Sequence, residues 1–152
     1  MRYGYFDNEN REYVIEKIDL PCSWTNYIGV KDMAGVFNHT AGGYVWYKSP
    51  EHHRITRFRG NAIPADRPGH YVYLRDDDTG EYWSLTYQPA PAGTAGAGAL
   101  RATPLRAPYS ARFGLSYNRY FCNYSDINAT QTLFIPKDDP VELWDVVLKN
   151  ES

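Results

Sequence analysis

The residues of this chain that most invite a chemical role are three arginines and the two aromatic residues that shortly precede them. The run 54–59 alternates, so a strand there would place two of its arginines on one face and the third on the other. Guanidinium groups bind carboxylate and phosphate through paired hydrogen bonds, and aromatic rings stack on the C–H face of a sugar. We therefore interpret this surface as a candidate substrate-binding site. Its members are Tyr44, Trp46, Arg54, Arg57 and Arg59.

The same residues also allow simpler interpretations. The arginine run can be a solvated strand face whose side chains form ion pairs with the acidic turn 76–78, and the sequence alone favours this alternative. The pair Gly42-Gly43 before the aromatic residues predicts a β-bulge first, and the close approach of another backbone or of a ligand second.

No catalytic or metal-binding pattern is recognisable. The four histidines, at positions 39, 52, 53 and 70, lack the spacing of a zinc site, and we expect His52 and His53 to be solvated loop residues. No nucleophile lies in a recognisable strained turn. Cys22 and Cys122 predict two buried thiols, with a disulfide as the alternative. We expect no catalytic residue, no metal and no cofactor in this chain.

Length and charge limit the class of protein. A chain of 152 residues is long enough for one domain with a genuine core. Its net charge of -2 argues against nucleic-acid binding, which needs a basic surface. The first residues lack the apolar core of a signal peptide, and no apolar run approaches the roughly 20 residues of a membrane span. We therefore expect a cytoplasmic protein with neither nucleic acid nor a membrane as partner.

The elements that must position the candidate site are strands. Helical periodicity is almost absent, and short runs separated by turn residues are typical of an antiparallel all-β domain, which we expect to be a β-sandwich. The expected strands are 2–6, 12–16, 34–38, 42–47, 54–59, 70–75, 81–87, 114–121, 127–135 and 141–148.

Four segments need separate expectations. Residues 66–89 predict an aromatic-rich hairpin around the turn Asp78-Thr79-Gly80, with Tyr71 and Tyr73 on its wet face. Residues 24–29 are expected to be irregular, with Trp24 and Tyr27 closing an edge of the core. Residues 89–108 are rich in Ala, Gly and Pro and predict a flexible loop. The strand at 141–148 is either a final edge strand or one that lacks its partner strands.

Several ordered segments of the chain resemble the disaccharide phosphorylases of glycoside hydrolase family 94. The resemblance includes Asn10-Arg11-Glu12-Tyr13 and Asp66-Arg67-Pro68-Gly69, and it covers most of the chain outside 90–111. One departure is Phe113, where the family tends to carry His. The resembling segments are 1–7, 10–15, 24–29, 41–44, 54–59, 66–89, 133–136 and 144–147.

The resemblance implies that residues 1–152 are a partial N-terminal domain, the first part of a galactose-mutarotase-like β super-sandwich. It also implies a longer parent, commonly a homodimer, whose separate (α/α)6 barrel binds the sugar substrate and holds the active site. There inorganic phosphate is the co-substrate and attacks the anomeric carbon of a β-linked disaccharide such as chitobiose or cellobiose. An Asp of the barrel protonates the leaving oxygen, and the product is an α-sugar 1-phosphate. No position of this chain inherits that acid.

The sequence therefore supports three interpretations of function. The first is the inactive N-terminal portion of an inverting phosphorylase, with roles in packing, dimerisation and shaping the substrate entrance. The second is a free-standing carbohydrate-binding β-sandwich with a stacking platform of aromatic rings. The third is a structural interaction domain. The rings considered for the platform are Tyr44, Trp46, Tyr71, Tyr73 and Trp83.

Overall fold

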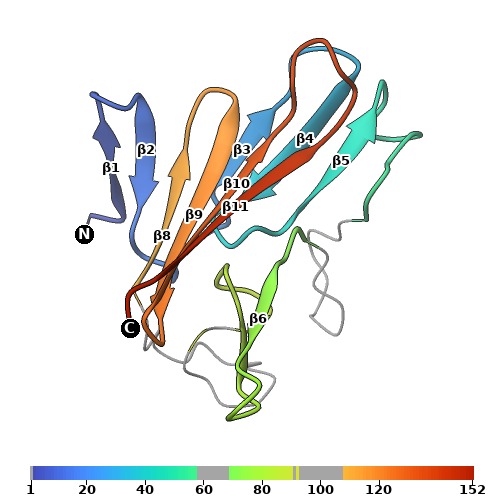
Figure 1. Cartoon of the computed structure of the whole chain (residues 1–152). Coiled ribbons are helices and arrows are strands. Elements are labelled where there is room, and N and C mark those ends of the chain that lie inside the picture. The colour runs from blue at the N-terminus through green and yellow to red at the C-terminus, as the bar shows by residue number, and fades with distance from the viewer. Residues whose placement is uncertain (1, 58–68, 91, 93–107) are drawn as a thin grey trace.

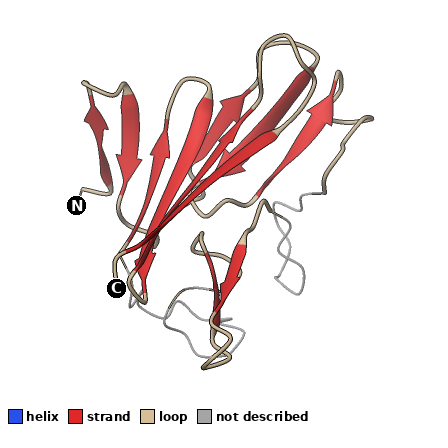
Figure 2. Ribbon diagram, viewed as in Figure 1, coloured by secondary structure: helices blue, strands red, loops and turns tan. Residues whose placement is uncertain are grey.

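The computed structural model describes residues 2–57, 69–90, 92 and 108–152. Over these residues the chain forms eleven strands and no helix (Figure 2), so the predicted all-β antiparallel class is confirmed. Among the described residues there is accordingly no helix that is long and apolar enough to cross a membrane.

Two antiparallel sheets and a short hairpin make up the fold (Figure 1). In order across the large sheet, the strands are β1 (Gly4–Asp7), β2 (Glu12–Ile15), β8 (Tyr109–Phe113), β9 (Tyr117–Tyr124), β10 (Ile127–Phe134) and β11 (Leu143–Asn150). The small sheet contains β3 (Thr25–Ile28), β4 (Met33–Asn38) and β5 (Gly43–Tyr47), and the hairpin contains β6 (Tyr73–Arg75) and β7 (Tyr82–Ser84).

Alternation of side chains creates the core between the sheets. On β10, Ala129, Gln131 and Leu133 are buried, and the residues between them are half-buried, as expected for a strand with one face toward a core. On the small sheet, Phe37 and Val45 are buried on the facing side. The aliphatic and aromatic residues of both sheets thus form one cluster.

A buried turn between β4 and β5 joins the two sheets. The Asn38 Oδ1 accepts hydrogen bonds from the backbone N–H of Thr40 (2.9 Å) and of Gly42 (2.8 Å), which closes the turn internally. From the large sheet, the Tyr120 hydroxyl donates to the Asn38 carbonyl oxygen (2.9 Å), and the Tyr109 hydroxyl donates to the His39 carbonyl oxygen (2.8 Å). The Asn38 carbonyl oxygen also accepts from the backbone N–H of Ala41 (3.1 Å), so the buried polar groups of the turn are paired both within the turn and across to the large sheet.

Gly43 is required by close backbone approach, because a Cβ there would collide with the Val36 carbonyl oxygen. Gly42 forms an isolated bridge to the backbone of Gly69, and a Cβ there would press on the Asn38 side chain. The pairing register runs without interruption from Gly43 to Tyr47. The bulge that the sequence favoured is therefore wrong, and the alternative of an approaching backbone is confirmed.

Several predicted boundaries need correction. The strand predicted at 54–59 is wrong over its described residues, where Arg54 makes only an isolated bridge to Trp46. Residues 24–29 were expected to be irregular but contain β3. The strand predicted at 114–121 begins later, as β9, and is preceded by β8, which was not predicted. The predicted loop at 89–108 lies mostly outside the described residues.

The aromatic hairpin is confirmed, but it is shorter than predicted. β6 and β7 pair through Arg75 and Tyr82, and Gly80 has a positive φ of 74°, as the turn chemistry required. Tyr73 is exposed as predicted. Tyr71 instead packs against the core, so its placement on a wet face is wrong.

We predict that Tyr120→Phe destabilises the fold by about 1–3 kcal/mol, because it removes the hydrogen bond from the large sheet to the Asn38 carbonyl oxygen and leaves the buried Asn118 Nδ2 without its acceptor. Urea unfolding followed by circular dichroism measures the change. Tyr73→Phe, at a side chain that is 51% exposed, is the matched control and should change the free energy of unfolding by less than about 0.5 kcal/mol. Equal effects of the two substitutions would contradict the role given to the buried turn.

Candidate functional site

The small sheet presents the predicted aromatic residues on its outer face. Tyr44 and Trp46 alternate with the buried Val45 along β5, and their ring centroids lie 5.3 Å apart. The Arg54 guanidinium carbon lies 5.1 Å from the centre of the Tyr44 ring, a cation–π distance. Tyr27 was expected to close an edge of the core, but this is wrong: it is 68% exposed, and its ring lies 6.3 Å from that of Trp46 on the same outer face. The alternation along residues 25–28 could have revealed it.

The arginines contribute unequally to this outer face. Arg54 is exposed, and its Nε donates to the Pro50 carbonyl oxygen at 2.6 Å. Arg57 is also exposed, and Arg59 lies outside the described residues. The acidic turn pairs internally through Arg75, whose Nε lies 3.5 Å from an oxygen of Asp77. The structure therefore brings Tyr44, Trp46 and Arg54 together.

The exposure of Trp83 and of the histidines shows which of these side chains a ligand could reach. Trp83 is only 4% exposed and stacks against Tyr124, so its use as an exposed stacking platform is ruled out. His52 and His53 are exposed, as predicted. His70 is 1% exposed, which the sequence pattern did not reveal.

Two further buried side chains that can ionise are those of His70 and Cys122. The His70 Nε2 lies 3.3 Å from an oxygen of Glu142, and the imidazole packs against the ring of Trp144. Cys122 is buried, and burial raises the pKa of its thiol to about 11. Cys22 is exposed, so the prediction of two buried thiols is half correct, and both cysteines are free.

Among the described residues, no group of three His, Cys, Asp or Glu is arranged to hold a metal ion.

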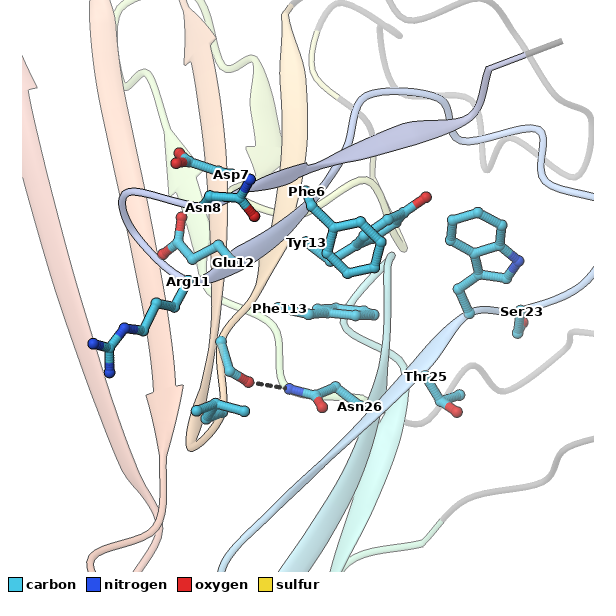
Figure 3. Close-up of a pocket in the computed structure, with 13 residues that line it drawn as sticks. Phe6, Asp7, Asn8, Arg11, Glu12, Tyr13, Ser23, Thr25, Asn26 and Phe113 are labelled. Atoms are coloured by element: carbon cyan, nitrogen blue, oxygen red, sulfur yellow. Dashed lines mark hydrogen bonds between the residues drawn. The ribbon is translucent and has the colours of Figure 1, made fainter.

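A cleft of about 760 Å³ lies at one end of the sandwich, between the β1–β2 hairpin, the start of β3 and the turn after β8 (Figure 3). Figure 3 shows the rings of Phe6, Tyr13 and Phe113 gathered in the middle of the view. Thr25 and Asn26 lie on one side of these rings, and Asp7 lies on the other. The cleft was not predicted, because its residues come from four separate parts of the chain.

A charged network holds the strands beside this cleft. The side chain of Glu12 is fully buried and accepts a hydrogen bond from the Tyr117 hydroxyl at 2.6 Å. Its two carboxylate oxygens also lie 3.1 Å from Arg112 and 3.3 Å from Arg119. Arg112 reaches Asp7 as well, at 3.4 Å. Because every charge has an opposite neighbour, the network fixes β1, β2, β8 and β9 together.

The described part of the chain is an all-β sandwich whose surface carries aromatic rings, side-chain amides and arginines. A comparison with protein families agrees with the sandwich fold: residues 11–152 match the family described as glycosyl hydrolase 94, supersandwich domain. The chain belongs to this family and carries its supersandwich domain.

Individual relatives are similar over essentially the whole chain. It is 52% identical over 152 residues to an N,N'-diacetylchitobiose phosphorylase of Vibrio proteolyticus, and 49% identical to one of Vibrio furnissii. It is 32% identical over 158 residues to a solabiose phosphorylase of Paenibacillus borealis. These alignments cover 100%, 100% and 99% of this chain. The chain spans only 18% of the length of each of these relatives.

We predict that Glu12→Gln destabilises the fold strongly, because it leaves Arg112 and Arg119 facing each other without their shared carboxylate. The expected loss is toward the lower end of about 3–5 kcal/mol, since both guanidinium groups are partly exposed. Urea unfolding measures it. The matched control is Glu16→Gln, at an exposed position on the same segment, which should change stability by less than about 0.5 kcal/mol. A loss no larger than that of the control would contradict the structural role of the network.

Proposed function

We propose that this chain is the N-terminal portion of an inverting disaccharide phosphorylase that cleaves a β-linked disaccharide of the chitobiose or cellobiose type. The observation that carries the proposal is the identity of 52% and 49% over the whole chain to two N,N'-diacetylchitobiose phosphorylases. A relative named solabiose phosphorylase, at 32% identity, supports the reaction class more than any one sugar.

In this proposal the chain supports catalysis without performing it. Inorganic phosphate attacks the anomeric carbon, the bond to the leaving sugar breaks, and a carboxylic acid protonates the leaving oxygen, giving an α-sugar 1-phosphate. Both the acid and the sugar-binding barrel belong to the longer parent. The sandwich alone is inactive, and its roles are packing, dimerisation in a homodimeric parent and shaping of the substrate entrance.

Exposed apolar side chains on the last strand support a packing role. On β11, Leu143, Trp144, Val147 and Leu148 are between 39% and 54% exposed, although they belong to a regular strand. In the described sheet β11 is paired on one side, to β10, so its other edge also carries free backbone groups. Further β-structure of the parent would cover both the edge and these side chains.

The outer face of the small sheet is the proposed contribution to the substrate entrance. Tyr44 and Trp46 offer ring faces, and Arg54 offers positive charge for a phosphate or a sugar phosphate. Arg57 and Arg59 belong to the proposed site by their place in the sequence alone. The proposed partners are therefore small molecules in a cytoplasmic enzyme, with neither nucleic acid nor a membrane among them.

A chimera tests the proposed function. We predict that the chitobiose phosphorylase of Vibrio proteolyticus keeps its activity when this chain replaces the matching segment. The expected rate of N,N'-diacetylchitobiose phosphorolysis is within about tenfold of the unaltered protein, or about 1.4 kcal/mol in activation free energy. Sugar 1-phosphate is measured by ³¹P NMR.

Two controls make the chimera informative. The 152-residue chain alone and the relative without its matching segment should each give no sugar 1-phosphate. A soluble, folded chimera that yields no more product than these controls would overturn the assignment, and so would turnover by the isolated chain.

A further inference from the structure

The cleft between β1–β2, β3 and the turn after β8 has no role in the proposed function, and its composition is unusual for an unused surface. Phe6 is 76% exposed and Leu115 is 86% exposed, although both side chains are apolar and both line this cleft. Exposed apolar groups that gather in one concave place are typical of a binding site.

The rings in the cleft form a connected row. The Phe6 and Tyr13 centroids lie 4.8 Å apart in an edge arrangement, and the Tyr13 and Trp24 centroids lie 5.4 Å apart. The row continues to Tyr3, whose ring centroid is 6.2 Å from that of Trp24. Because each ring supports the next, the exposed face of Phe6 is held as a fixed apolar platform.

Polar groups lie beside this platform in fixed positions. The Asn26 Nδ2 donates to the Gly114 carbonyl oxygen at 2.9 Å and to the Asn118 Oδ1 at 2.8 Å. With its nitrogen used in this way, Asn26 offers its Oδ1 to a ligand hydroxyl. Thr25 and Asn8 line the same cleft and are exposed, so they add a hydroxyl and an amide.

Both carboxylates that line the cleft are paired. Asp7 and Glu12 are each paired with Arg112, and Glu12 also pairs with Arg119. Arg11 lines the cleft as well, but its side chain points away from the rings (Figure 3). A charged ligand would have to compete with these pairs, whereas a neutral ligand would not. The volume of about 760 Å³ falls in the usual range of small-molecule sites, roughly 300–1,000 Å³.

We propose that this cleft binds a neutral pyranose sugar. One C–H face of the sugar ring stacks on Phe6, and its hydroxyl groups form hydrogen bonds with Asn26 and Thr25. A pyranose ring has an apolar C–H face and hydroxyl groups at its edge, and it therefore matches this combination of a fixed aromatic platform and neutral polar groups. The site stands on the geometry of this chain and does not depend on the reaction of the parent.

Titration of the 152-residue chain with N,N'-diacetylchitobiose and with cellobiose tests the proposal. We expect at least one of the two sugars to give saturable changes in tryptophan fluorescence and in the amide NMR signals of residues 23–26, with a dissociation constant of about 1 mM or lower. Phe6→Ala should weaken binding at least about tenfold, and circular dichroism checks that this exposed position leaves the fold intact.

Matched controls separate the cleft from other surfaces. Tyr82→Ala changes an aromatic residue on β7 that is 48% exposed, and it should alter the affinity by less than about twofold. Sorbitol, which has hydroxyl groups but no ring face, should give no saturable change. The proposal is overturned if neither sugar binds up to about 10 mM, if sorbitol binds equally well, or if Trp46→Ala abolishes binding while Phe6→Ala does not. None of these outcomes bears on phosphorolysis by the chimera.

Discussion

The fold depends on one constraint: the turn between β4 and β5 lies inside the core, so its backbone polar groups must find partners there. Asn38 is 8% exposed and Ala41 is fully buried, with Ala41 in the left-handed region at a φ of 65°. The Asn38 side chain closes the turn, and the hydroxyls of Tyr109 and Tyr120 bind its carbonyl groups from the opposite sheet. A buried polar group left unpaired costs about 1–3 kcal/mol, so these bonds favour the observed packing of the two sheets.

Local patterns in the sequence predicted a large part of this fold. Alternation predicted β2, β5 and β10 closely, and Gly80 marked the hairpin turn. β8 was missed for a physical reason: one of its partners, β2, is distant in the sequence, so local propensity alone does not mark it. β3 pairs with the next strand, β4, and was missed because four residues give only a weak local signal. The roles of Tyr120 and His70 were hidden in the same way, since each depends on partners from other strands.

Binding surfaces were predictable only where their residues are close in sequence. One example is the outer face of the small sheet: Tyr44 and Trp46 lie on β5, and Arg54 follows β5 shortly afterwards in the sequence. The structure places these three side chains close together. The cleft is lined by residues from separate segments of the chain, such as Phe6, Trp24 and Phe113. No short sequence pattern connects these residues. The match to the glycosyl hydrolase 94 supersandwich domain spans residues 11–152, so it includes the residues of both surfaces except Phe6 and the residues next to it in the sequence. In this account the chain contributes surfaces, and the buried turn holds those surfaces in place.

Native-state hydrogen exchange of the turn amides tests this account most directly. The N–H groups of His39, Thr40 and Gly42 bind the Trp24 carbonyl oxygen or the Asn38 side chain inside the protein. If the turn joins the sheets, these amides exchange only through global unfolding, with the same opening free energy as the amides in the centre of β9. Exchange through a local opening, with a free energy lower by about 2 kcal/mol or more, would contradict the claim that the two sheets depend on this turn.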